Sequence, residues 1–301
     1  MSDEILGQLD RSWKSLPFEY SPITKRKPIK WPNDARVAFF VAPNLEHFPI
    51  DKPGPVSLTH TSNYDVPSYS WRDYSLRIGL WRVMEMMDEY KVRGTVALNS
   101  SICKYYPEVV KACKERNWEL MGHGISNSWL NADLDEKAER SVIAEVVRTI
   151  KETTGKAPQG WLGPALSETP KTLDLLAENG IKYVCDWGND EQPYPMKVKS
   201  GTLISMPYSI ELNDVSIFIS QKLSPQAFYQ ACVDQFDILY EEGLRNGKVM
   251  CIAIHPWIIG VPFRAKYFKM ALEYITKKKN VWITTGSEIT EWYISNYMNH
   301  C

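Results

Sequence analysis

The sequence lacks the features that mark several large classes of protein. No stretch of its 301 residues approaches the run of about 18 apolar residues that a membrane-spanning helix needs. The first residues are acidic and contain no apolar run, so they do not resemble a secretory signal. The charges nearly cancel, because 35 Lys and Arg residues oppose 36 Asp and Glu residues. We therefore expect a cytoplasmic protein with no nucleic-acid partner and no membrane partner.

Paired cysteines and the common cofactor and nucleophile motifs are also missing. The six cysteines are scattered without a C-x-x-C pair, and a chain of this size does not need disulfides, so free thiols are expected. There is no P-loop, no G-x-G-x-x-G after a strand and no G-x-S-x-G elbow. These absences argue against P-loop nucleotide hydrolysis, dinucleotide binding and serine-esterase chemistry.

The sequence does contain a regular alternation of short apolar runs and amphipathic segments. Apolar runs rich in β-branched and aromatic residues predict strands, and apolar residues at helical spacing predict helices. Such alternation is typical of a mainly parallel sheet covered by helices, either open or closed into a barrel. The predicted strands cover residues 35–45, 94–99, 118–124, 157–164, 182–188, 216–221, 248–257 and 281–286. The predicted helices cover residues 74–90, 107–117, 134–155, 169–180, 224–243, 263–278 and 287–298.

We predict one domain preceded by an arm. Residues 1–34 are polar and contain four prolines, so we expect them to lie over the domain or over a partner subunit. Residues 35–301 contain no linker and no internal repeat, which indicates a single catalytic domain. Residues 48–70 are rich in proline and predict a long loop, and the pattern leaves open whether this loop is a lid.

Polar side chains follow several predicted strands at the point where each strand ends. In folds of this kind, the loops at the carboxyl ends of parallel strands form the active face. Three of the five histidines lie at such positions, so we expect the polar set to converge on one rim. The set comprises Asn44, Glu46, His47, Asn99, His123, Ser126, Asn127, Trp161, Asp186, Asn189, Asp190 and His255.

Four of these residues have side chains suited to catalysis. Glu46 is a carboxylate that can act as a general base or as a metal ligand. His123 lies between two glycines, where the backbone can turn sharply and other groups can approach. His255 closes an apolar strand and can donate a proton to a leaving nitrogen. Asp186 is expected to orient His255 and to raise its pKa.

Five segments, taken in order, resemble the polysaccharide deacetylase (NodB-homology) family. They are NLEH, HGISN, GWLGP, CDWGNDEQPY and IHPWIIGVPFR, and the resemblance covers residues 35–290. It is closest to an intracellular branch that contains allantoinase-like and cyclic-imide-hydrolase-like proteins. The resemblance implies an α/β fold, a distorted (β/α)7 barrel of the NodB-homology type, and a homo-oligomer that is a dimer or a tetramer.

The resemblance also assigns places within the family's active site. In the sugar deacetylases of the family, one aspartate is the base, a second aspartate and an H-x-x-x-H pair bind a divalent metal, and a late histidine is the acid. Asn44 stands at the place of the base and Glu46 at that of the metal-binding aspartate. His123 and Asn127 stand at the places of the two metal histidines, and His255 stands at that of the acid.

Two of these positions, Asn44 and Asn127, differ from the family pattern. An amide is a poor zinc ligand, and hard oxygen donors suit magnesium or manganese better. The metal set implied by the resemblance is therefore Glu46, His123 and Asn127, holding Zn, Mn or Mg. In the alternative without a metal, Glu46 is the base that activates water, and His123 with backbone N–H groups stabilises an oxyanion.

We expect a hydrolase of non-peptide carbon–nitrogen bonds that opens a small cyclic amide, imide or ureide with activated water. One alternative is a metal-dependent N-deacetylase of an amino sugar, and another is an inactive family member that serves as a binding protein. Of the arginines near the predicted rim, we retain only Arg264 as a substrate clamp. The residues expected to bind the small-molecule substrate are Asn44, His47, Trp71, Asn127, Trp161, Trp187, Asp190 and Arg264.

Overall fold

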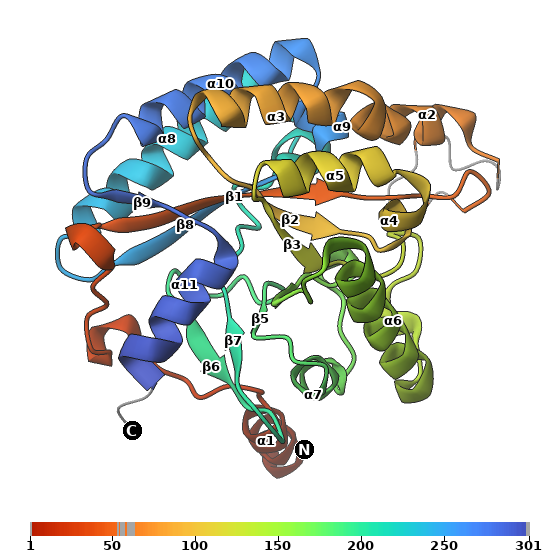
Figure 1. The fold of residues 1–301 in the computed structure, drawn as a ribbon. Coiled ribbons are helices and arrows are strands. Elements are labelled where there is room, and N and C mark those ends of the chain that lie inside the picture. Colours follow the sequence, from red (N-terminus) through yellow and green to blue (C-terminus); the bar gives the residue numbers. More distant parts are fainter. Residues whose placement is uncertain (1, 53, 55–57, 59–63, 299–301) are drawn as a thin grey trace.

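The computed structural model describes residues 2–52, 54, 58 and 64–298. It shows a curled, mainly parallel sheet with helices packed around it (Figure 1). The predicted α/β class and the distorted barrel are therefore confirmed. The strands are β1 (Val37–Leu45), β2 (Thr95–Leu98), β3 (Glu119–Gly122), β4 (Gly160–Trp161), β5 (Tyr183–Val184), β6 (Tyr194–Met196), β7 (Leu203–Ser205), β8 (Lys248–Ile254) and β9 (Val281–Ile283).

The strand order places the carboxyl ends of the central strands side by side. The order is β6-β7-β5-β4-β3-β2-β1-β8, with β9 also paired to β1. These pairings are parallel except that of β6 with β7. β1 reads VAFFVAPNL and is buried along its whole length, as expected for a parallel strand covered on both faces. The ends of β8, β1, β2 and β3 therefore open toward the same side of the sheet.

The helices cover the sheet, and capping residues set the ends of α6. Asp135 caps α6 by accepting a hydrogen bond from the Ala138 N–H at 2.8 Å, and Gly155 ends it with a left-handed φ of 82°. The helices are α1 (Ser2–Lys14), α2 (Val66–Tyr74), α3 (Leu80–Glu89), α4 (Ser101–Tyr105), α5 (Pro107–Glu115), α6 (Glu136–Thr154), α7 (Thr172–Glu178), α8 (Pro225–Glu242), α9 (Pro256–Ile259), α10 (Pro262–Thr276) and α11 (Gly286–Tyr293). None of the helices in the described part of the chain is both long and apolar enough to span a bilayer.

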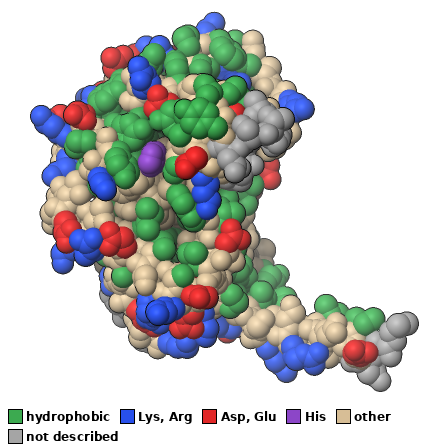
Figure 2. Space-filling view, turned by 90° about the vertical axis from the view of Figure 1, so that its right-hand side faces the viewer, with side chains coloured by type: hydrophobic (Ala, Val, Ile, Leu, Met, Phe, Trp, Pro, Cys, Tyr) green, Lys and Arg blue, Asp and Glu red, His purple; other side chains and the backbone are tan. Residues whose placement is uncertain are grey.

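The N-terminal arm has two parts. α1 extends away from the body of the molecule, and its apolar side chains Ile5, Leu9 and Trp13 are exposed (Figure 2). Residues 16–34 lie on the body, where Trp31 is buried and donates a hydrogen bond from its indole to the Lys248 carbonyl at 2.9 Å. The predicted contact of the arm with a partner subunit, and the predicted dimer or tetramer, stay predictions.

Two sequence-based element predictions are wrong. Residues 216–221, predicted as a strand, belong to a π-helical segment over Val215–Ser220, because a short apolar run has no periodicity that separates the two structures. The predicted loop 48–70 ends early, since α2 starts at Val66 with Pro67 in its first turn, where proline is well tolerated. The question of a lid falls partly on residues 53, 55–57 and 59–63, which lie outside the described residues.

The first prediction concerns Gly79, which lies against the turn that follows His255. A Cβ atom at Gly79 would lie 2.1 Å from the carbonyl oxygen of Pro256, so Gly79→Ala must displace α9. We expect a loss of about 1–3 kcal/mol in the free energy of unfolding, measured by urea denaturation. Gly7→Ala in α1 is the control, because its Cβ would have only Arg11 Nη1 nearby, at 3.6 Å. Equal midpoints for the two variants would contradict this packing.

Candidate active site

The carboxyl ends of adjacent strands surround a small cavity of about 130 Å³. Glu46 follows β1, His123 follows β3 and His255 follows β8, and each side chain lines this cavity. The structure thus brings together three of the four residues predicted to be catalytic. Other lining residues include Asn44, Phe48, Arg72, Asn127, Tyr208 and Trp257.

The carboxylate of Glu46 lies at the centre of the polar groups. Its Oε1 atom lies 3.6 Å from His123 Nε2 and 3.5 Å from His255 Nε2. Burial would raise the pKa of the Glu46 carboxyl, but the positive charge on His255 outweighs burial and holds this pKa well below its usual range. Glu46 is therefore ionised at neutral pH and can accept a proton only when its surroundings change.

His255 is held between two carboxylates. Its Nδ1–H donates to Asp214 Oδ1 at 2.7 Å, and its backbone N–H donates to Asp214 Oδ2 at 2.7 Å. Burial would lower the pKa of His255, but the charges of Glu46 and Asp214 outweigh burial and raise this pKa to about 10. His255 is therefore a buried imidazolium, the protonation state that a general acid requires.

Asp214 takes the position beside His255 that sequence patterns predict for Asp186. The Asp186 carboxylate instead accepts a hydrogen bond from the Gly163 N–H at 2.7 Å, and burial together with the nearby Glu168 raises its pKa well above the usual value. Asp214 is hard to find from the sequence because it directly precedes residues 215–220, whose apolar character predicts a strand. Asp186 therefore supports the loop after β4, and Asp214 orients His255.

His123 has a fixed ring orientation. Its Nδ1 lies 2.7 Å from the Leu162 carbonyl oxygen, which can only accept, so Nδ1 carries a proton. Its Nε2 is buried and has no hydrogen-bond partner among the described residues. Gly124 follows with a left-handed φ of 66°, a backbone conformation that favours glycine, so the turn after His123 requires this residue. His123 thus presents Nε2 to the cavity beside Glu46.

Asn127 presents its amide nitrogen to Glu46. Its Nδ2 donates a hydrogen bond to Glu46 Oε1, while its Oδ1 faces Asn99 Nδ2 at 3.4 Å. Asn99 is fixed in turn, because its Oδ1 accepts from the His47 N–H at 2.8 Å. The NH2 group of Asn127 therefore stabilises the ionised form of Glu46, while the amide oxygen of Asn127 is directed toward Asn99.

The donor set does not fit the metal predicted at Glu46, His123 and Asn127. An amide NH2 group has no lone pair to give a cation, and the protonated His255 has none either. In the described part of the chain, no group of three or more His, Cys, Asp or Glu side chains is arranged to hold a metal ion. Only Glu46 and His123 remain as potential ligands, too few for a structural or catalytic zinc site.

Several residues predicted to bind substrate do not line this cavity. Trp161 is fully buried in the core, and the His47 ring contacts Ser101 Oγ at 2.9 Å. Trp71 packs against Trp257, which lines the cavity, with ring centroids 4.5 Å apart. Arg264 stacks its guanidinium on Phe218, Trp187 donates from its indole to Glu168, and neither lines the cavity. Of the predicted substrate-binding residues, Asn44 and Asn127 do line it.

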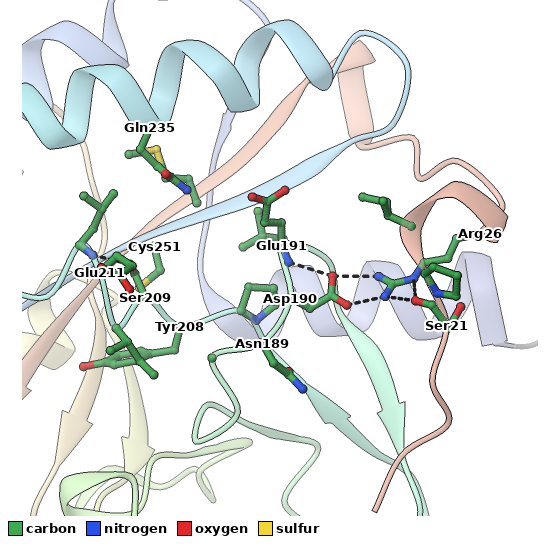
Figure 3. Close-up of a pocket in the computed structure, with 18 of the residues that line it drawn as sticks. Ser21, Arg26, Asn189, Asp190, Glu191, Tyr208, Ser209, Glu211, Gln235 and Cys251 are labelled. Carbon is green, nitrogen blue, oxygen red and sulfur yellow. Dashed lines mark hydrogen bonds and ion pairs between the residues drawn. The ribbon is translucent and has the colours of Figure 1, made fainter. Parts of the chain in front are cut away.

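Asp190 belongs to a second and larger cavity of about 610 Å³ (Figure 3). Its carboxylate pairs with Arg26, whose Nη1 lies 2.8 Å from Asp190 Oδ1. Tyr208 lines both cavities and accepts a hydrogen bond on its hydroxyl from Asn44 Nδ2 at 3.0 Å. Asp190 therefore ties the N-terminal arm to the body.

Arg72 is a charged cavity residue that the sequence-based prediction leaves out. It is 4% exposed in α2, and its guanidinium carbon lies 3.9 Å from the centroid of the Phe48 ring. In the sequence it is one of several arginines in the segment 72–82, and no spacing distinguishes it from those on the surface.

Comparison with known proteins points to one group of relatives. The model of the family described as polysaccharide deacetylase matches residues 73–184. A candidate polysaccharide deacetylase of Schizosaccharomyces pombe is 28% identical over 300 residues, which cover 88% of this chain and 93% of that protein. A probable polysaccharide deacetylase of Pseudomonas aeruginosa PAO1 is 26% identical, with a TM-score of 0.82 over 91% of this chain and 96% of that one. The chain is therefore similar to polysaccharide deacetylases in sequence and in fold.

This similarity bears on the class of reaction. Polysaccharide deacetylases hydrolyse carbon–nitrogen bonds, so the similarity supports a hydrolase of that class at the level of the family. The solved structure of Puue allantoinase is 23% identical, with a TM-score of 0.78 over 93% of this chain and 99% of that chain, and it shows the shared fold.

The second prediction tests which carboxylate acts on His255. Asp214→Asn removes a negative charge 2.7 Å from His255 Nδ1, so the pKa of His255 should fall from about 10. The side-chain ¹⁵N resonances of His255, followed by NMR as the pH is raised, report this pKa directly. Asp186→Asn is the control and should leave the His255 titration in place. A shift in the control and none in Asp214→Asn would restore the assignment to Asp186.

Proposed function

We propose that this protein opens the ring of a small neutral cyclic amide, imide or ureide with water. The observation that carries the proposal is that Glu46 and His255 face each other, with Oε1 and Nε2 3.5 Å apart, in a cavity of about 130 Å³. Pockets for drug-sized ligands occupy about 300–1,000 Å³, so this cavity suits a single small ring. Base and acid are both present in the protonation states that amide hydrolysis needs.

Glu46 activates the water. A water beside Glu46 Oε1 gives a proton to the carboxylate as its oxygen bonds to the ring carbonyl carbon. The carbonyl oxygen becomes an oxyanion, which the positive charge of His255 stabilises across the low-dielectric cavity. His123 Nε2, 3.6 Å from Glu46 Oε1, is placed to hold the same water by accepting its second hydrogen.

His255 completes the reaction. It gives its proton to the ring nitrogen, the carbon–nitrogen bond breaks, and one carboxylic acid and one N–H group are formed. Loss of the imidazolium charge removes the interaction that lowers the pKa of Glu46, so the two proton transfers assist each other. The proton on Glu46 can then return to His255 across the 3.5 Å that separates Oε1 from Nε2.

One alternative is supported by the names of relatives. The Schizosaccharomyces pombe protein is a candidate polysaccharide deacetylase, and removal of an N-acetyl group would use the same acid and base. The amides at Asn44 and Asn127 instead favour a second alternative, an inactive member of the family that binds a ligand. Incubation of the protein with succinimide, hydantoin, dihydrouracil, allantoin and N,N′-diacetylchitobiose, followed by proton NMR, separates the three. Ring opening supports the proposal, free acetate alone supports a deacetylase, and no reaction supports the binding protein.

The third prediction concerns the base. Glu46→Gln keeps the shape of the side chain but cannot accept a proton, so kcat for ring opening should fall by about 100- to 10,000-fold. The circular dichroism spectrum should be unchanged. Glu211→Gln on the exposed surface is the control and should retain the wild-type kcat. A Glu46→Gln enzyme with wild-type kcat would remove Glu46 from the mechanism.

The fourth prediction concerns metal. Because Asn127 turns its NH2 group to Glu46 and His255 is protonated, dialysis against EDTA should leave kcat unchanged. Elemental analysis of the dialysed protein should confirm that Zn and Mn have been removed. Loss of activity that Zn, Mn or Mg restores would show instead that Glu46, His123 and Asn127 rearrange to bind a metal.

A further inference from the structure

Arg72 is a buried cation on the wall of the catalytic cavity. It lines the same cavity as Glu46, His123 and His255, although it comes from α2 and not from a strand end. Burying a guanidinium is costly unless opposite charges compensate it, and the carboxylates of Glu46 and Asp65 both act on Arg72. Glu46 and His255 carry out the proton transfers of the proposed reaction, so Arg72 has no assigned role in them.

Phe48 packs against the guanidinium. The guanidinium carbon lies over the Phe48 ring, 3.9 Å from its centroid, within the range of a cation–π contact. All five N–H donors of an arginine lie in the guanidinium plane. An arginine held in this way recognises oxygen atoms through its edge, at a defined direction and distance.

The charges of the site favour a neutral ligand. Two carboxylates, Glu46 and Asp214, are opposed by two cations, His255 and Arg72, and the nearby Asp65 adds a further negative charge that acts on Arg72. The site therefore has no excess positive charge with which to attract an anion. The oxygen that Arg72 recognises is better supplied by a carbonyl group than by a carboxylate.

We propose that Arg72 binds the second carbonyl oxygen of a ring that contains two, and that it thereby selects cyclic imides and ureides over lactams. The proposal rests on the ring-opening function above. One carbonyl lies at Glu46 and His255 and is attacked, while the other accepts hydrogen bonds from Arg72. A lactam or an N-acetyl group has only one carbonyl and leaves Arg72 without this contact. Arg72 is therefore a specificity-determining residue.

Binding measured without turnover tests this assignment. In the Glu46→Gln protein, isothermal titration gives the Kd of succinimide, with two carbonyls, and of 2-pyrrolidinone, with one. Adding Arg72→Gln should weaken succinimide by about 10- to 100-fold, the effect of losing a hydrogen bond to a charged donor. The Kd of the lactam should rise by less than about threefold, because its single carbonyl lies beside His255 and makes no contact with Arg72.

Matched variants separate recognition from folding. Arg77→Gln changes a neighbouring arginine whose side chain is 74% exposed, and it should leave both Kd values unchanged. Arg72→Lys keeps the charge without the planar fork and should restore only part of the succinimide affinity. Equal weakening of both ligands by Arg72→Gln, or no weakening of either, would overturn the two-carbonyl assignment.

The outcome is independent of the test of function. If the wild-type protein opens no ring but the Arg72→Gln change still weakens succinimide selectively, the proposed reaction fails and the recognition by Arg72 stands. If rings are opened and the two ligands weaken equally, the reaction stands and Arg72 has a packing role on Phe48.

Discussion

The site depends on one imidazolium that two buried carboxylates share. Asp214 lies 2.7 Å from His255 Nδ1, and Glu46 lies 3.5 Å from its Nε2. A buried carboxylate is costly unless an opposite charge and hydrogen bonds compensate it, and here the same ring compensates two of them. The protonation state of each group therefore depends on the other two. The three groups therefore react as a unit, because loss of the proton from His255 removes the charge that lowers the pKa of Glu46.

The fold creates this trio through two parallel contacts on β8. On one edge, β1 pairs with β8 from Val37↔Lys248 to Pro43↔Ile254, which sets Glu46 and His255 side by side beyond the strand ends. On the other edge, the segment after β7 forms a short bridge, Asn213↔Ala253, where the sheet has no further regular strand among the described residues. That bridge brings the next residue, Asp214, under His255. An irregular closure of the barrel thus supplies the residue that orients the acid.

The predictability of each residue follows from its position in the chain. Glu46, His123 and His255 can be found from the sequence because apolar strands end directly before them, and parallel strands bring such ends together. Asp214 and Arg72 cannot, since one follows an irregular bridge and the other lies on a helix whose orientation only packing decides. Trp161 shows the opposite error: it ends a strand, but the alternation of side chains along that strand directs it into the core.

The two amides that depart from the family pattern have a common physical consequence. Asn44 Nδ2 donates to the Ile254 carbonyl at 3.3 Å, an acceptor that would repel a carboxylate at this position. Asn127 donates to Glu46, where an imidazole lone pair would repel the same oxygen unless a cation lay between them. Asn127 stands in place of a group that could bind a metal, and Asn44 stands in place of a base that could share a proton beside a metal. Each amide instead donates a hydrogen bond to a nearby oxygen. Glu46 is left as the one carboxylate that lines the cavity in the described part of the chain, and an ionised carboxylate facing an imidazolium can activate water by itself.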